Sequence, residues 1–305
     1  MKKKDFISIR SVATDELRQL LTDAVAIKAA PAKYSEILKG KTLALVFEKP
    51  SLRTRVTFDV GIYQLGGHAV YLSPAEISLG KRESVADVAR NLERMVQGIM
   101  IRTFGHAIVE EMARVASIPV INGLTDFSHP CQALADYMTI IEIKGDLNGL
   151  KLAYVGDGNN VANSLMFAAA RLGVHLAVAT PRGYEPGGEV VKWTNEQGRR
   201  TGCKLEVTND PVLAATGADV IYTDVWASMG QEAEAAERRR IFQPYQVNEE
   251  LFSHAKPDAV FMHCLPAHRG EEVSAGVIDS PRSVVFQQAE NRLHAQKAVL
   301  LSLMG

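Results

Sequence analysis

The sequence predicts an α/β protein of two domains, each a parallel β-sheet flanked by helices. Short apolar runs bounded by glycine and proline alternate along the chain with longer stretches of helical spacing, the pattern of parallel strands joined by crossover helices. The 305 residues exceed the size at which one hydrophobic core usually stops growing, so two domains are expected. With 47% hydrophobic and 23% charged residues, the composition is that of an ordinary globular protein.

The first domain is expected to begin with a helix over residues 12–28, with Thr14 as its cap. Residues 42–47 form an apolar run typical of a buried parallel strand, and a helix is predicted over residues 55–65. The remaining elements expected in this domain are strands at 69–72, 98–101 and 118–121, and helices at 85–95, 108–116 and 130–143.

The turn-rich segment 144–149 is the best candidate for a domain boundary. We therefore predict domains at 1–146 and 147–285, with a C-terminal helix of about 286–305 packing back onto the first. The second domain is expected to contain strands at 152–155, 175–179, 218–222 and 260–262, and a solvated helix or mobile loop in the charge run 232–240.

Charge and cysteine content exclude several classes of protein. The formal net charge of −1 provides no general attraction for nucleic acid or for a membrane surface, and no segment is apolar enough to span a bilayer. The three cysteines are too few and too widely separated to suggest a disulfide framework, which predicts a cytoplasmic protein.

A candidate anion site lies where the strand at 42–47 passes into the next helix. Ser51, Arg53, Thr54 and Arg55 bring hydroxyls and guanidiniums to a helix start, where free backbone N–H groups favour an anion such as phosphate. A capped helix with exposed arginines explains the same residues equally well.

Polar side chains at other strand ends and helix starts extend this hypothesis. His129 and Gln132 are three positions apart at a helix start, so both side chains can hydrogen-bond one carbonyl group. Arg102 follows a predicted strand and is expected at the carboxyl-end crevice of the sheet. A surface arginine and a structural histidine are the alternatives, and Arg292 by itself is uninformative.

The second domain offers an amino-acid site rather than a dinucleotide site. Residues 156–160, GDGNN, open a helix after a strand, but Val161 replaces the third glycine of the dinucleotide motif and no acid follows the next strand. We assign Asn160 instead to an amino-acid substrate. Asp224, which follows another strand, is suited to an ammonium group, whereas Cys264 is either a ligand contact or an inert buried thiol.

Together these segments resemble the aspartate/ornithine carbamoyltransferase family over nearly the whole chain. SLRTR at 51–55 and HPCQ at 129–132 are shared across the family, whereas DVWASMG at 224–230 and HCLP at 263–266 are similar to the branch whose acceptor is ornithine. The resemblance implies carbamoyl transfer from carbamoyl phosphate to the δ-amine of L-ornithine, giving L-citrulline and phosphate in arginine metabolism. It implies no metal, no organic cofactor, and a homotrimer or multiple of trimers with shared active sites.

The resemblance also assigns roles to individual residues. The catalytic residues would be Arg53, Arg102, His129, Gln132 and Cys264. Carbamoyl phosphate would be bound by Ser51, Leu52, Arg53, Thr54, Arg102, His129, Gln132, Cys264, Leu265 and Arg292. L-Ornithine would be bound by Asn160, Asp224, Ser228 and Met229.

Two positions depart from the family pattern. Leu52 replaces a frequent threonine, and Ser78 replaces a frequent glutamine in the loop that reaches the neighbouring subunit. Three other functions are left open: a transferase acting on another amine such as N-acetylornithine or putrescine, a nicotinamide dehydrogenase, and a non-catalytic paralogue.

Overall fold

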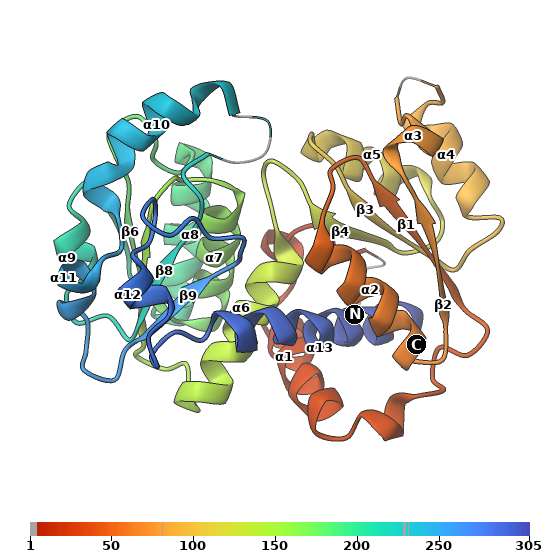
Figure 1. The fold of residues 1–305 in the computed structure, drawn as a ribbon. Helices are drawn as coiled ribbons and strands as arrows, with labels where there is room; N and C mark the ends of the chain where they lie inside the picture. Colours follow the sequence, from red (N-terminus) through yellow and green to blue (C-terminus); the bar gives the residue numbers. More distant parts are fainter. Residues whose placement is uncertain (1–4, 81, 228–229, 231) are drawn as a thin grey trace. The chain divides into compact units, whose positions relative to one another are not determined.

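The structure, a computed structural model, describes residues 5–80, 82–227, 230 and 232–305. The chain folds into two compact units, one of Met1–Met138 with Glu290–Gly305 and one of Thr139–Ala289. The division therefore falls inside a helix, eight residues before the boundary expected at 146. Each unit is an α/β structure with its own parallel sheet, as the sequence predicts (Figure 1).

The sheet of unit 1 has four parallel strands in the order β2-β1-β3-β4. They are β1 (Thr42–Phe47), β2 (His68–Leu72), β3 (Gly98–Arg102) and β4 (Val120–Leu124). The helices are α1 (Thr14–Ala29), α2 (Leu52–Gln64), α3 (Pro74–Ile77), α4 (Val85–Leu92), α5 (His106–Val115), α6 (Pro130–Lys144), which ends in unit 2, and α13 (Val285–Met304), which begins there.

Apolar burial on both faces of this sheet explains its continuous hydrophobic strands. Ala44, Val46 and Ile99 share a core with α4 and α5, so these two helices cover one face. On α2, Gly61 faces Leu293 and Lys297 of α13, and a side chain at Gly61 would meet both at ordinary van der Waals distance. Because the strands are packed in this way, the carboxyl ends of β1 and β3 are held in place, and so are the residues that follow each strand.

The sheet of unit 2 has five parallel strands in the order β7-β6-β5-β8-β9. They are β5 (Lys151–Val155), β6 (His175–Ala179), β7 (Leu205–Thr208), β8 (Val220–Thr223) and β9 (Val260–His263). The helices are α7 (Asn160–Leu172), α8 (Gly188–Thr201), α9 (Pro211–Ala215), α10 (Ala235–Phe242), α11 (Glu249–Ser253) and α12 (Ala275–Ile278).

The core of unit 2 lies between this sheet and the helices α9, α11 and α12. Helices α7 and α8 pack against each other, and Phe167 and Trp193 meet edge to face between them. The strand order changes direction at β5 and β8, since β6 lies on one side of β5 and β8 on the other. Crevices at the carboxyl ends of such neighbouring strands are the usual ligand sites of open α/β sheets. In the part of the chain that the structure describes, no helix meets the length and apolarity needed to cross a membrane.

One local prediction was wrong. Thr14 is the first residue of α1 rather than its cap, and the Glu16 carboxylate accepts a hydrogen bond from the Ala13 N–H at 3.4 Å instead. The charge run 232–240 contributes to a mostly exposed helix, α10, as expected. Its exception is Arg238, which is 6% exposed because it bonds to the distant Asp157.

Candidate active site

The phosphate candidate lies at the start of α2, directly after β1. Ser51 is the N-cap, and its hydroxyl accepts a hydrogen bond from the Thr54 N–H at 3.2 Å. Leu52, the first helical residue, has a 74% exposed side chain, so its backbone rather than its side chain is suited to the site. The helix start therefore supplies N–H groups and a positive dipole end.

Thr54 is where buried arginines from two distant elements meet. Its hydroxyl accepts hydrogen bonds from Arg292 on α13 at 2.8 Å and from Arg102, the last residue of β3, at 3.5 Å. Both guanidiniums are less than a tenth exposed. Burying two cations together is costly unless an anion compensates them, so this arrangement favours an anion site over a plain capped helix.

His129 and Gln132 join the same group of residues. They lie at the start of α6, after β4, and are 4% and 1% exposed. The Gln132 Oε1 accepts a hydrogen bond from Arg292 at 3.0 Å. Burial, together with the charges of Arg292, Arg102 and then Arg53, holds the pKa of His129 well below its ordinary value of 6.5. The imidazole is therefore neutral at neutral pH and carries one donor N–H.

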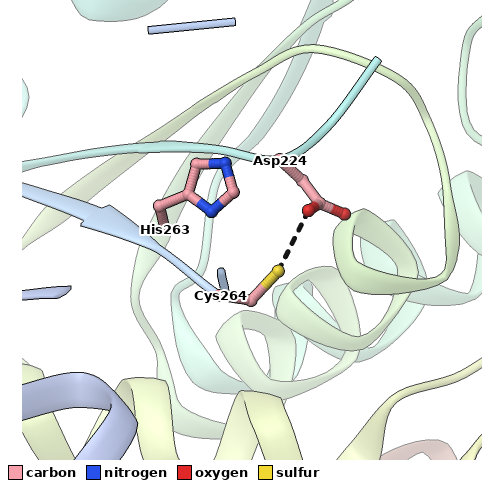
Figure 2. A group of neighbouring side chains, drawn as sticks. All are labelled: Asp224, His263 and Cys264. Atoms are coloured by element: carbon pink, nitrogen blue, oxygen red, sulfur yellow. Dashed lines mark hydrogen bonds between the residues drawn. The ribbon is translucent and has the colours of Figure 1, made fainter. Parts of the chain in front are cut away.

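The other site lies in unit 2, at the ends of β5, β8 and β9. Asp224 follows β8 and is 5% exposed. The Asn159 Nδ2 donates a hydrogen bond to the Asp224 Oδ2 at 2.8 Å, and the Cys264 thiol donates to its Oδ1 at 3.0 Å. Figure 2 shows Cys264 and Asp224 pointing toward each other. A carboxylate fixed at both oxygens is a preorganised partner for a cation.

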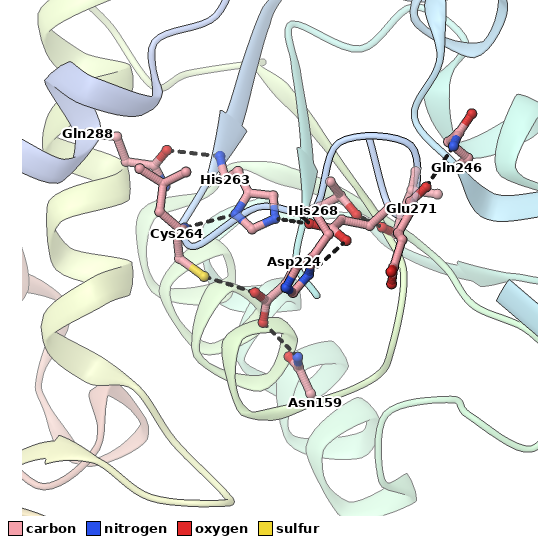
Figure 3. Close-up of polar contacts among 12 residues, drawn as sticks. Asn159, Asp224, Gln246, His263, Cys264, His268, Glu271 and Gln288 are labelled. Carbon is pink, nitrogen blue, oxygen red and sulfur yellow. Dashed lines mark hydrogen bonds and ion pairs between the residues drawn. The ribbon is translucent and has the colours of Figure 1, made fainter. Parts of the chain in front are cut away.

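The turn after β9 is held by a buried histidine. The His263 Nδ1 accepts a hydrogen bond from the Leu265 N–H at 2.8 Å, so Nε2 carries the proton and donates to the Glu272 Oε1 at 3.1 Å. The backbone N–H of His263 donates to the Gln288 Oε1 at 3.0 Å (Figure 3). Leu265 has a φ of 59°, a left-handed conformation that a leucine adopts only when neighbouring contacts impose it. Burial pushes the pKa of Glu272 up, but hydrogen bonds from His263 and the His268 N–H outweigh burial and hold that pKa below its ordinary value.

Asp224, His263 and Cys264 each offer a metal-ligand atom, and these atoms lie within 4.8 Å of one another. Both ring nitrogens of His263 already have partners in the protein, however, so coordination through this ring would break one of its two hydrogen bonds. The thiol likewise already bonds to the carboxylate.

Ser228 and Met229, which were predicted to bind ornithine, lie outside the described residues.

Both units match models of known protein domains. Residues 4–142 match the carbamoyl-phosphate-binding domain of aspartate/ornithine carbamoyltransferases, and residues 148–303 match the aspartate/ornithine-binding domain. The chain belongs to this family. Because the match covers both units, the family predicted from the sequence is confirmed.

Individual carbamoyltransferases resemble the chain over nearly its full length. A protein from Thermococcus kodakarensis named ornithine carbamoyltransferase is 59% identical over 99% of this chain and 96% of its own. The structure of ornithine carbamoyltransferase from Pyrococcus furiosus has a TM-score of 0.96 at 56% identity, covering 99% of this chain and 97% of the other. An acetylornithine transcarbamylase solved with acetylcitrulline is 33% identical, with a TM-score of 0.89, covering 99% of this chain and 100% of the other.

In the GDGNN segment of this chain, Gly158 has a packing role. A side chain at Gly158 would lie 2.4 Å from the Pro186 backbone nitrogen, so only glycine fits there. Asp157 is 8% exposed and pairs with Arg238 at 3.0 Å. Asn160, half-buried at the start of α7, stands beside the cap Asn159. These contacts explain the motif without a dinucleotide.

Sequence reasoning missed three residues that hold the site together. Asn159 fixes Asp224, Asp136 accepts a hydrogen bond from Gln132 at 2.8 Å, and Arg238 ties α10 to Asp157. The helix-cap position of Asn159 was visible in the sequence, and Asp136 stands one helical turn after Gln132. Nothing in the sequence pairs Arg238 with an acid 81 positions away.

Proposed function

We propose that this chain is an ornithine carbamoyltransferase, which transfers the carbamoyl group of carbamoyl phosphate to the δ-amine of L-ornithine. The products are L-citrulline and phosphate, and the physiological role is in arginine biosynthesis. One observation carries the assignment of the acceptor: Asp224, a buried carboxylate fixed by Asn159 and Cys264, is suited to the free α-ammonium of an amino acid. Relatives at 56–59% identity carry the same activity in their names.

Carbamoyl phosphate is assigned to unit 1. Ser51, Arg53, Thr54 and the Leu52 N–H bind the phosphate at the start of α2, with Arg292 completing the cationic surroundings. Arg102, His129 and Gln132 donate to the carbonyl oxygen. Each such donor stabilises the negative charge that develops in the transition state, and loss of one typically costs about 10²–10³ in rate.

Ornithine is assigned to unit 2. Asp224 pairs with the α-ammonium, while Asn160 and the backbone of Ser228 and Met229 hold the α-carboxylate. Cys264 and the Leu265 backbone contact the carbamoyl group as the reaction proceeds. The rigid turn around Leu265, fixed by His263, supports this role because it orients the Leu265 peptide group.

The reaction needs no group beyond the two substrates to balance. The neutral δ-amine attacks the carbonyl carbon, forming a C–N bond and a tetrahedral intermediate whose oxygen carries the negative charge. The C–O bond to phosphate then breaks, and the departing phosphate takes the amine proton. The neutral state of His129 suits a hydrogen-bond donor that does not itself transfer a proton. Holding both reactants in position supplies much of the remaining acceleration.

A panel of acceptor amines tests this assignment. Carbamoylation of ornithine, putrescine, aspartate and N-acetylornithine is measured for the wild-type chain and for Asp224→Asn. Ornithine is expected to be preferred over N-acetylornithine by about 100-fold or more in kcat/KM, because acetylation removes the α-ammonium that Asp224 pairs with. Asp224→Asn is expected to raise the KM for ornithine far more than that for carbamoyl phosphate. Preference for N-acetylornithine or putrescine would contradict the assignment.

The assembly we propose is a homotrimer or a multiple of trimers in the cytoplasm. Its support is an exposed apolar stripe along α2, where residues spaced by one helical turn share a face. The stripe consists of Leu52, Val56, Val60 and Tyr63, which are 36–76% exposed.

The three cysteines are free thiols, in keeping with a reducing compartment. Ser78 donates its hydroxyl to the Pro74 carbonyl at 3.3 Å, stabilising its own turn.

A further inference from the structure

The Gln132 side-chain amide is held between two partners of opposite hydrogen-bonding character. Its Nε2 lies 2.8 Å from the Asp136 Oδ1, and its Oε1 lies 3.0 Å from the Arg292 Nη1. Asp136 is 0% exposed and Gln132 is 1% exposed. Both residues belong to α6 and are one turn apart, so the helix itself sets the spacing between the carboxylate and the amide.

Chemistry fixes the orientation of this amide without reference to hydrogen positions. A guanidinium can only donate and a carboxylate can only accept, so the amide oxygen must face Arg292 and the amide nitrogen must face Asp136. The amide nitrogen has two N–H groups, and Asp136 takes one of them. The other N–H is the donor that the transition-state oxygen requires.

We propose that Asp136 is a positioning residue for carbamoyl transfer, which locks the Gln132 amide in the orientation that presents an N–H to the carbonyl oxygen of the substrate. This inference rests on the proposed function. Arg292 alone fixes only the oxygen side of the amide, whereas the charged acceptor Asp136 fixes the nitrogen side. The effect is preorganisation, since the amide is already turned before the negative charge develops.

A merely structural role is the alternative, because a buried carboxylate can also hold a helix in place. The two explanations differ in what happens when Gln132 has no amide to orient. Asp136→Asn removes the charge and offers the amide a group that can donate as well as accept, so the orientation is less strictly fixed. This change should matter to catalysis only while Gln132 is present.

A double-mutant cycle on turnover separates the explanations. The chains compared are the wild type, Asp136→Asn, Gln132→Met and the double variant, each assayed for citrulline at saturating substrates. Gln132→Met is expected to lower kcat about 100-fold and Asp136→Asn about 10-fold or more. In the Gln132→Met background, Asp136→Asn is expected to lower kcat by less than about 3-fold. Asp136→Glu keeps the charge but displaces it, so its loss of kcat should likewise depend on the presence of Gln132. This variant replaces Asp136→Asn in the cycle if the asparagine variant does not fold.

Equal losses of kcat in both backgrounds would overturn the proposal, as would unchanged turnover in Gln132→Met or in both Asp136 variants. Asp219→Asn is the matched control, because Asp219 is a 3% exposed carboxylate of unit 2 that bonds to the Lys151 N–H and to Lys256. It is expected to lower the melting temperature without changing kcat. Citrulline formation by the wild type tests the proposed function separately from the cycle.

Discussion

At the scale of single residues, the site of unit 1 combines fixed charges with a neutral donor. His129 is buried among Arg292, Arg102 and Arg53, and this burial and positive charge favour its neutral form. A protonated imidazole would add a further positive charge beside these guanidiniums, and their charges would repel it. The neutral ring can still donate one N–H to the carbonyl oxygen, which is all that the proposed mechanism asks of it.

The pKa of His129 gives a testable consequence. In NMR spectra of the folded chain with labelled histidine, the His129 ring signal is expected to stay constant from about pH 8 down to pH 6, whereas in the unfolded chain it titrates near 6.5. Below pH 6.5 the unfolded state binds a proton that the folded state rejects, so His129 lowers the free energy of unfolding as the pH falls through that range. Titration of the folded ring near pH 6.5 would contradict this account.

The sequence revealed individual site residues better than their partners. Asp224 and Cys264 each follow a strand, so their placement at strand ends followed from the apolar runs before them. Their mutual hydrogen bond joins residues 40 positions apart, and only the order β8-β9 in the sheet brings them together. The sequence suggested an inert thiol as one alternative for Cys264, and that interpretation did not anticipate the carboxylate.

At the scale of elements, α10 is held by a buried arginine, Arg238, in addition to the apolar packing of Phe242. The Arg238 Nη1 bonds to the Asp157 Oδ2 at 3.0 Å and to the Trp226 carbonyl at 2.9 Å. Trp226 comes two residues after Asp224, so Arg238 ties α10 to the backbone beside the proposed ornithine site. Burial raises the pKa of Asp157, and the adjacent guanidinium offsets this only in part.

Arg238→Met is therefore expected to loosen the acceptor site. It leaves Asp157 buried without its cation, a change that typically costs about 3–5 kcal/mol of stability. The KM for ornithine is expected to rise several-fold with little change in that for carbamoyl phosphate, measured together with the melting temperature. Arg239→Met is the control, because Arg239 pairs with Glu271 in an exposed bridge. Indistinguishable effects of the two variants would disprove the anchoring role.

The elements that sequence patterns predicted well are those buried on both sides. β1 and β6 have the bounds expected from their apolar runs, because a central parallel strand needs apolar residues throughout. β7 was missed: the residues of this edge strand are partly buried or exposed, and its four residues give too short a signal. The division between the two units falls within the continuous helix α6, where the helical spacing of the sequence gives no signal of a boundary.

At the scale of the whole molecule, each unit is assigned one substrate, and the apolar stripe on α2 is assigned to assembly. The proposed trimer interface would explain why four large apolar residues of one helix face are exposed in the single chain. The stripe begins at Leu52, the residue after the N-cap Ser51, so our proposals place assembly and phosphate binding on the same helix. The sequence alone did not distinguish these exposed residues from core residues.

Val56→Asp tests the role of the stripe. A charge at this position is expected to shift the protein from trimer to monomer in light scattering after gel filtration, and to lower activity without loss of helical circular dichroism. Leu213→Asp on α9 is the matched control, because Val56 and Leu213 are both 48% exposed. An unchanged trimer in Val56→Asp, or equal dissociation in the control, would place the interface elsewhere.

The most direct test of the central claim compares citrulline and phosphate release by the wild-type chain and by Arg53→Ala. Arg53 lies at the start of α2, where we propose that it stabilises the departing phosphate rather than the core. The wild type is expected to form citrulline and phosphate in equal amounts from carbamoyl phosphate and ornithine. Arg53→Ala is expected to remain folded and to lose measurable turnover. Near-normal citrulline formation by Arg53→Ala would contradict the claim.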